Sequence, residues 1–159
     1  MAKTLVNLVI TEFVAQEVDF SQLFSRQSAN VKQTVRHEVV EPAVNAEHYP
    51  SNNQFCLIAV LGHSDRVDTP GLSAEQRREQ ERDASAKRAT SASEWVFDQI
   101  TAALTAAGEN PPASVADATN FDIYTVPCGA ADLVNVVPTN EAQRKENRRV
   151  EFAISTYFP

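Results

Sequence analysis

The chain has 159 residues, of which 43% are hydrophobic and 22% are charged, and its formal net charge is -7. This length fits a single domain with one core, and the apolar content argues against intrinsic disorder. The negative charge argues against a nucleic-acid-binding protein, because a phosphate backbone would be repelled.

The first third of the chain predicts a strand, a helix and a second strand. Residues 6–10 place apolar side chains at alternate positions, which is typical of a strand. Residues 25–44 predict a helix, because three valines lie four residues apart on one face, and Pro42 is expected to kink or end it. Residues 45–54 are rich in Asn, Pro and Ser and predict a loop, and residues 55–61 (FCLIAVL) predict a buried strand.

A long helical region is expected next. Ser73 and Gln76 have the spacing of a capping box, so a helix could begin there. Residues 74–88 have almost no apolar face and predict a solvated helix or an ordered loop. Residues 89–107 carry an apolar stripe at helical spacing, and Gly108 is expected to end that helix.

Two strands complete the predicted order, at residues 120–126 (NFDIYTV) and 149–158 (RVEFAISTYF). The predicted fold class is α/β, an α+β sandwich with the order βαβαββ and a single domain over residues 1–159. Its mixed four-stranded sheet would carry two long helices on one face. Residues 55–61 should form an internal strand, since an exposed edge of that apolarity would aggregate.

The cysteines and the N-terminal segment bear on the compartment. Cys56 and Cys128 are too far apart for a CxxC motif; they could pair in an oxidising compartment, but two free buried thiols are favoured. Residues 1–13 lack the uninterrupted apolar stretch of a signal peptide, and no segment predicts a membrane span. We therefore expect a chain that works without cleavage of a leader.

The second strand runs directly into a polar triplet, His63, Ser64 and Asp65. A metal site is not expected, because none of the histidines lies in a ligand pair such as HxxxH. A hydrolase is not expected either, because the chain has no GxSxG motif and adjacent strand residues point to opposite faces. The simplest interpretation is that Ser64 or Asp65 caps the turn after the strand. We expect no enzymatic activity and no cofactor.

Three motifs nevertheless occur together and in order: VLGHSD after the second strand, ASAKRA at the start of the apolar helix, and ENRRVEFAI at the last strand. In this order the chain resembles the OmpA-like C-terminal domain family, whose members bind peptidoglycan. That family has a GHTD-type turn, an LSxxRA-type helix entry and an NRRVE-type final strand. The resemblance extends from about residue 17 to the C-terminus.

The resemblance implies a non-catalytic module that binds the diaminopimelate of the peptidoglycan stem peptide. The implied ligand-binding residues are Asp65, Arg88, Asn147 and Arg148, with His63 and Ser64 orienting the turn from behind. Asp65 would pair with the ammonium group of diaminopimelate, and Arg88 would bind its carboxylate through two parallel hydrogen bonds. Gly62 would let the backbone leave the strand sharply.

The chain also departs from the family pattern. Residues 66–82 look like an insertion, which we expect to protrude, and Glu81 stands where the family usually has asparagine. The family resemblance places the module in the cell envelope or periplasm. The alternative is a structural or docking subunit of a phage tail or contractile injection apparatus, assembled in the cytoplasm, with other subunits as partners and a vestigial or modified cell-wall site.

Overall fold

The computed structural model describes residues 3–159 and contains one mixed sheet of four strands. The strands are β1 (Lys3–Ile10), β2 (Phe55–Gly62), β3 (Phe121–Pro127) and β4 (Val150–Tyr157). Their order across the sheet is β1-β4-β2-β3, with β2 parallel to β3 and the other neighbouring pairs antiparallel. The predicted fold class and the internal position of β2 are confirmed.

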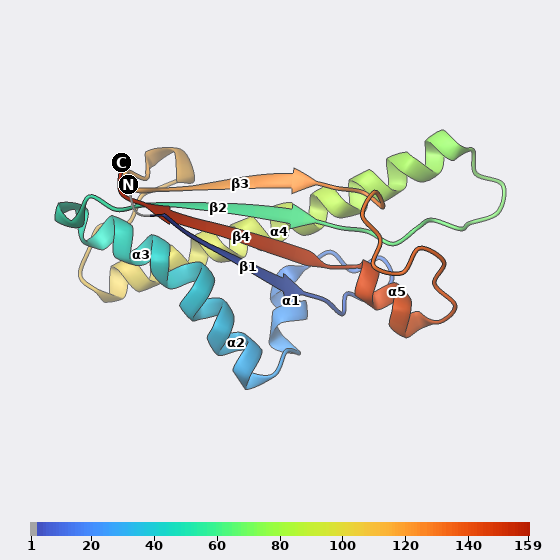
Figure 1. The fold of residues 1–159 in the computed structure, drawn as a ribbon, viewed down its shortest axis with the longest axis horizontal. Coiled ribbons are helices and arrows are strands. Elements are labelled where there is room, and N and C mark those ends of the chain that lie inside the picture. Colours follow the sequence, from blue (N-terminus) through green and yellow to red (C-terminus); the bar gives the residue numbers. More distant parts are fainter. Residues whose placement is uncertain (1–2) are drawn as a thin grey trace.

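Five α-helices connect and flank the strands (Figure 1). They are α1 (Phe20–Ser25), α2 (Ala29–Val35), α3 (Glu41–His48), α4 (Ala74–Ala106) and α5 (Glu141–Asn147). A π-helical turn (Arg36–Val40) joins α2 to α3, and short 3-10 turns lie at Pro50–Asn52 and Val115–Asp117. The first long helical region is therefore the run from α2 through α3, and the second is α4.

The first helical region differs from its predicted bounds. It begins after a break, where the Ser28 side chain caps α2, and it continues to His48 rather than ending near Pro42. Pro42 has no backbone N–H and lies in the first turn of α3, directly after the π-helical turn, where a missing hydrogen bond is tolerated. The prediction of a loop that starts at residue 45 is wrong for residues 45–48, which belong to α3. Burial of Ala43 and Ala46 keeps this segment helical.

Helix α4 is continuous over 33 residues and begins at the predicted capping box of Ser73 and Gln76. It ends at Ala106, and Gly108 follows with a φ of 83°, the left-handed conformation that favours glycine after a helix. The N-terminal part of α4 extends beyond the sheet (Figure 1). Within residues 3–159, no helix combines the length and apolarity needed to cross a bilayer.

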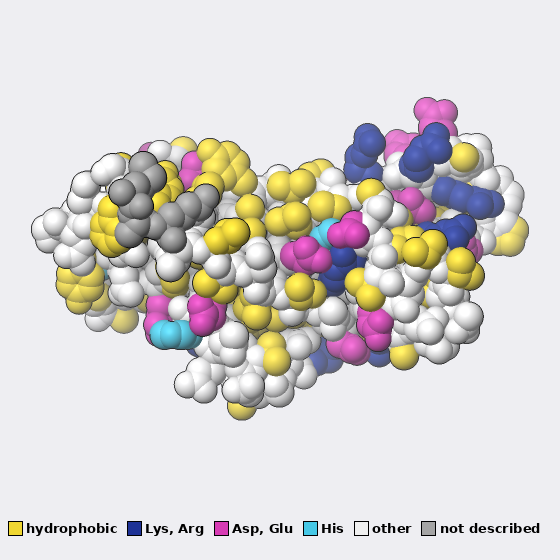
Figure 2. All heavy atoms as spheres, in the orientation of Figure 1, with side chains coloured by type: hydrophobic (Ala, Val, Ile, Leu, Met, Phe, Trp, Pro, Cys, Tyr) yellow, Lys and Arg dark blue, Asp and Glu magenta, His cyan; other side chains and the backbone are white. Residues whose placement is uncertain are grey.

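The core lies between the helices and one face of the sheet. Along β2, alternate residues are fully buried, whereas the residues between them are only partly covered. Phe20 packs edge-on against Phe152 of β4, at 5.7 Å between ring centroids, and against Trp95 of α4, at 5.2 Å. The opposite face carries apolar side chains that remain exposed, including Leu5 and Tyr124, and Figure 2 shows apolar side chains across the middle of the molecule.

Gly62, the last residue of β2, has a different role from the predicted one. It does not need a positive φ; instead, a Cβ atom added there would lie 1.9 Å from the Ser85 carbonyl oxygen and 2.9 Å from the Ala89 nitrogen. Helix α4 therefore crosses β2 at contact distance, and only glycine fits between them. This crossing places the end of β2 beside the middle of α4.

Both cysteines are free thiols, as favoured from the sequence. Cys56 is buried on β2, and burial raises its pKa to about 12. Cys128 follows β3 and is only half-buried. The prediction of two buried thiols is therefore correct for Cys56 and wrong for Cys128.

Candidate ligand-binding site

A cavity of about 230 Å³ opens where β2 ends. Its walls come from the turn after β2, the N-terminal half of α4, the loop between β1 and α1, and the segment from α5 to β4. The charged side chains that line it are Asp65, Arg66, Glu81, Arg88, Arg144 and Arg148. Segments far apart in the sequence thus bring cations and carboxylates to one small opening.

Arg88 is the most buried of these cations, with 2% of its surface exposed. Its Nε donates to the carbonyl oxygen of Glu17 at 2.9 Å, and its Nη1 donates to that of His63 at 3.1 Å. The guanidinium also lies over the ring of Phe13, 4.9 Å from the centroid. Burial, and next the nearby Arg148, lower the pKa of Arg88 to about 10. None of these partners is an anion, so Arg88 forms no ion pair within residues 3–159, although the nearby carboxylates of Glu17 and Asp65 favour its charged form.

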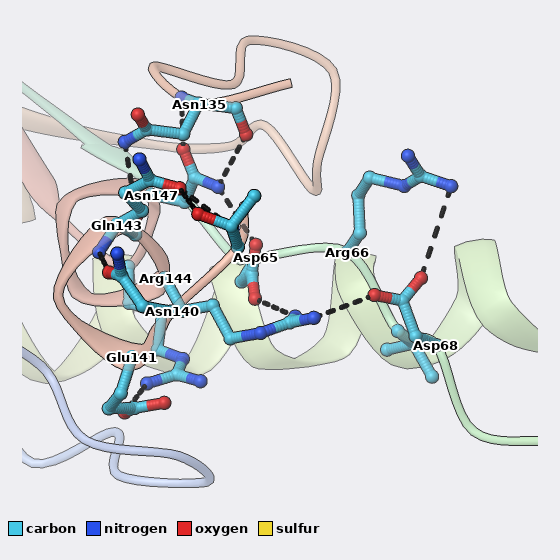
Figure 3. A network of polar contacts seen from close by, with 12 residues as sticks. Asp65, Arg66, Asp68, Asn135, Asn140, Glu141, Gln143, Arg144 and Asn147 are labelled. Carbon is cyan, nitrogen blue, oxygen red and sulfur yellow. Dashed lines mark hydrogen bonds and ion pairs between the residues drawn. The ribbon is translucent and has the colours of Figure 1, made fainter. Parts of the chain in front are cut away.

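Asp65 is also buried, but its carboxylate already has donors (Figure 3). Arg144 Nη1 donates to Oδ2 at 2.6 Å, and Asn147 Nδ2 donates to Oδ1 at 2.8 Å. Arg144 also donates to Asp68 Oδ2 at 3.0 Å through its Nη2, so one guanidinium joins two carboxylates. Hydrogen bonds to Asp68 and then to Asp65 raise the pKa of Arg144 above its usual value.

Arg148 borders the cavity next to Arg88 but has an anionic partner. Its Nη1 donates to Glu141 Oε1 at 2.6 Å and to the carbonyl oxygen of Phe13 at 3.4 Å. The hydrogen bond from Arg148 lowers the pKa of Glu141. Arg148 is therefore fixed by both α5 and the loop between β1 and α1.

That loop is itself held in an unusual conformation. Glu12 and Gln16 have positive φ angles of 87° and 63°, which are uncommon for residues other than glycine. Glu17 pairs with Arg26 of the segment after α1, and the hydrogen bond from Arg26 lowers the pKa of Glu17. The loop supplies carbonyl groups that fix both Arg88 and Arg148, so its backbone strain coincides with the candidate site.

His63 and Ser64 hold the turn through their main chains. His63 N donates to the Arg149 carbonyl oxygen at 2.9 Å, and Ser64 N donates to that of Gly129 at 2.9 Å. The imidazole of His63 is buried near Arg149, and its two nitrogens have no hydrogen-bond partner among the described residues. Burial, and then Arg149, lower the pKa of His63.

Of the residues that the sequence motifs single out, Asp65, Arg88 and Arg148 line the same cavity, and Asp65 and Arg88 do not form an ion pair with each other. Asn147 does not line the cavity; it lies behind Asp65, where its side chain donates to Asp65 and to the Asn135 carbonyl oxygen.

Sequence reasoning missed Arg144 and the carbonyl groups of residues 13 and 17. Arg144 could have been found, because it lies three residues before Asn147, on the same side of a short helix.

Neither a protein-family profile nor a curated protein matches the chain. Solved structures that match include the OmpA-like domain of FopA1 from Francisella tularensis subsp. tularensis SCHU S4, at 16% identity and a TM-score of 0.42, covering 96% of this chain and 73% of that one. The cell wall anchor of the T6SS from Pseudomonas aeruginosa matches at 18% identity and a TM-score of 0.43, covering 96% and 80%.

A MotB-like protein from Desulfovibrio vulgaris matches at 17% identity and a TM-score of 0.42, covering 94% of this chain and 74% of that one. One of these three structures is described as an OmpA-like domain.

Proposed function

We propose that the chain is a non-catalytic peptidoglycan-binding module of the cell envelope, and that its cavity binds the diaminopimelate of the stem peptide. The observation that carries this proposal is Arg88, a buried guanidinium that lines an open cavity and forms no ion pair within residues 3–159. Carboxylates line the same cavity, so a ligand that carries both a carboxylate and an ammonium group would meet a partner for each.

The electrostatics of Arg88 favour an anionic ligand. Burial disfavours its charged form, as the lowered pKa of about 10 indicates, yet it remains protonated at neutral pH. Its Nη2 has no hydrogen-bond partner within residues 3–159, and the atom belongs to a residue of the cavity wall. A ligand carboxylate would accept from this nitrogen and would offset the charge of Arg88.

The size of the cavity limits what can enter. Typical sites for drug-sized ligands begin at about 300 Å³, and this cavity has about 230 Å³. It would take the end of one side chain rather than a disaccharide. The free end of diaminopimelate has this size, because its amino and carboxylate groups share one carbon. Binding of this kind breaks no bond and needs neither a nucleophile nor a metal.

Sedimentation with purified sacculi tests the proposal. Wild type should be retained on diaminopimelate-type sacculi and much less on lysine-type sacculi, because the lysine side chain lacks the carboxylate that Arg88 would bind. Arg88→Ala should weaken retention at least about tenfold, since a charge-assisted hydrogen bond contributes roughly 1.5–3 kcal/mol. Arg78→Ala is the matched control, because Arg78 is exposed on the same helix, and it should bind as wild type does.

Folding is checked separately by thermal denaturation. Arg88→Lys is a second variant, which keeps the charge but lacks the planar pair of donors, and it should also lose most of the retention. The proposal fails if wild type is not retained, or if folded Arg88→Ala and Arg88→Lys proteins are retained as well as wild type.

A further inference from the structure

The charges around the cavity are mostly paired with one another. Asp65 is paired with Arg144, Arg148 with Glu141, and Arg66 lies 3.9 Å from Asp68. Two lining residues remain without an ionic partner within residues 3–159, the cation Arg88 and the anion Glu81. The ionic groups left for a ligand are therefore one guanidinium and one carboxylate, and the carboxylate is not that of Asp65.

Both groups project from the same helix. Glu81 and Arg88 lie about two turns apart on α4, which places them on one face. Ala84, which also lines the cavity, lies between them and leaves space for a ligand above its methyl group. The backbone nitrogen of Val67 donates to Glu81 Oε1 at 2.9 Å. This bond fixes the carboxylate, whereas Oε2 has no donor among the described residues.

Asp65 is less available than Glu81. Each of its oxygens already accepts from a charged or amide donor, at 2.6 Å from Arg144 and 2.8 Å from Asn147. Direct pairing with a ligand ammonium would have to share or displace the guanidinium of Arg144, which is also held by Asp68. Displacing this contact would leave Arg144 with only one of its two carboxylates.

We propose that Glu81 is the main acceptor for the amino group of the ligand, while Arg88 donates hydrogen bonds to the carboxylate of the ligand. Asp65 then acts as a positioning residue, because it holds Arg144 and Asn147 and thereby shapes the cavity. This inference rests on the proposed function and departs from the family resemblance at one point: the ammonium subsite lies on α4 instead of the turn after β2. Glu81, which departs from the family pattern in the sequence, is then a determinant of binding.

Three variants tested on diaminopimelate-type sacculi separate the two carboxylates. Glu81→Gln removes the charge but keeps an oxygen for the Val67 N–H, and it should weaken retention at least about tenfold, the effect of a lost charge-assisted bond. Asp65→Asn should weaken retention less than Glu81→Gln does. Glu79→Gln, on an exposed position of the same helical turn, should leave retention unchanged.

Each outcome decides between the proposals. If wild type is not retained at all, the proposed function fails and this inference fails with it. If wild type is retained and Arg88→Ala is not, the function stands. In that case a Glu81→Gln protein that binds as wild type does, or that loses no more than Asp65→Asn, overturns the role of Glu81 alone. Circular dichroism melting of each variant shows whether a loss reflects unfolding, and a destabilised Asp65→Asn protein is compared below its melting temperature.

Discussion

The two halves of α4 are built on different principles. From Ala89 onward the helix buries an apolar stripe, which includes Val96, Ile100 and Leu104, against the sheet. Before Ala89 it buries Ser85 and Arg88, and its other contacts are largely polar. One half stabilises the fold by removing apolar surface from water, whereas the other presents charges to a cavity. The same helix therefore serves as core and as binding surface, and the halves can be perturbed separately.

The largest expected effect comes from the apolar half. Ile100 is completely buried, and Ile100→Ala should lower the free energy of unfolding by about 2–5 kcal/mol, through lost transfer energy and a cavity. Chemical denaturation measures this change. At temperatures where the variant is folded, its retention on sacculi should match that of wild type. A selective loss of retention in a folded Ile100→Ala protein would show that the halves are coupled.

A second perturbation falls on the junction of the halves. Gly62→Ala would place a methyl group 1.9 Å from the Ser85 carbonyl oxygen, so α4 would have to move away from β2. We expect a loss of about 1–3 kcal/mol, the usual range for overpacking. Retention should also fall, since Arg88 follows Ser85 by one turn. If Gly62→Ala melts at the wild-type temperature, the close crossing of β2 and α4 is not rigid.

The contrast between the halves also explains what the sequence could predict. The strands and the second half of α4 follow from apolar periodicity, which is a local property. Asp65 and Arg88 were found only because motifs singled them out. The carbonyl groups of Phe13 and Glu17, which fix the two arginines, left no sequence signal, because any residue provides a carbonyl. The π-helical turn before Pro42 was missed because the apolar spacing of the sequence carried no signal for it.

A smaller effect on the free energy of unfolding should depend on pH. Burial lowers the pKa of His63, so the folded state keeps the imidazole neutral where the unfolded chain takes up a proton, below about pH 6.5. The unfolded state then binds more protons, and stability falls as the pH is lowered. Arg149 opposes protonation of His63, whereas Glu151 and Asp132 favour it.

Replacing His63 isolates the contribution of its protonation to the pH dependence of stability. Between about pH 7 and pH 5, wild type should lose more unfolding free energy than His63→Gln, by at most about 1.4 kcal/mol per pH unit for one proton. Urea titrations at several pH values measure the difference. His37→Gln, which replaces a histidine whose side chain is 70% exposed, is measured in parallel as a control for the removal of an imidazole. Equal slopes for wild type and His63→Gln would show that this imidazole is protonated in the fold as readily as in the unfolded chain.

The smallest effect on stability should come from removing the polar extension itself. Deleting residues 66–82 and closing the gap with a short turn removes the first turns of α4, whose apolar contacts with the sheet lie further along the helix. The expected change in unfolding free energy is small, since each doubling of loop length alters closure by only about 0.6 kcal/mol. Retention on sacculi should nevertheless be lost, because Glu81 leaves the cavity wall and Arg144 loses its contact with Asp68. Denaturant titration and sedimentation of the same preparation test both parts: a deletion protein that unfolds would place this segment in the core or in an obligate interface, and a folded one that still binds would show that the extension has no part in recognition.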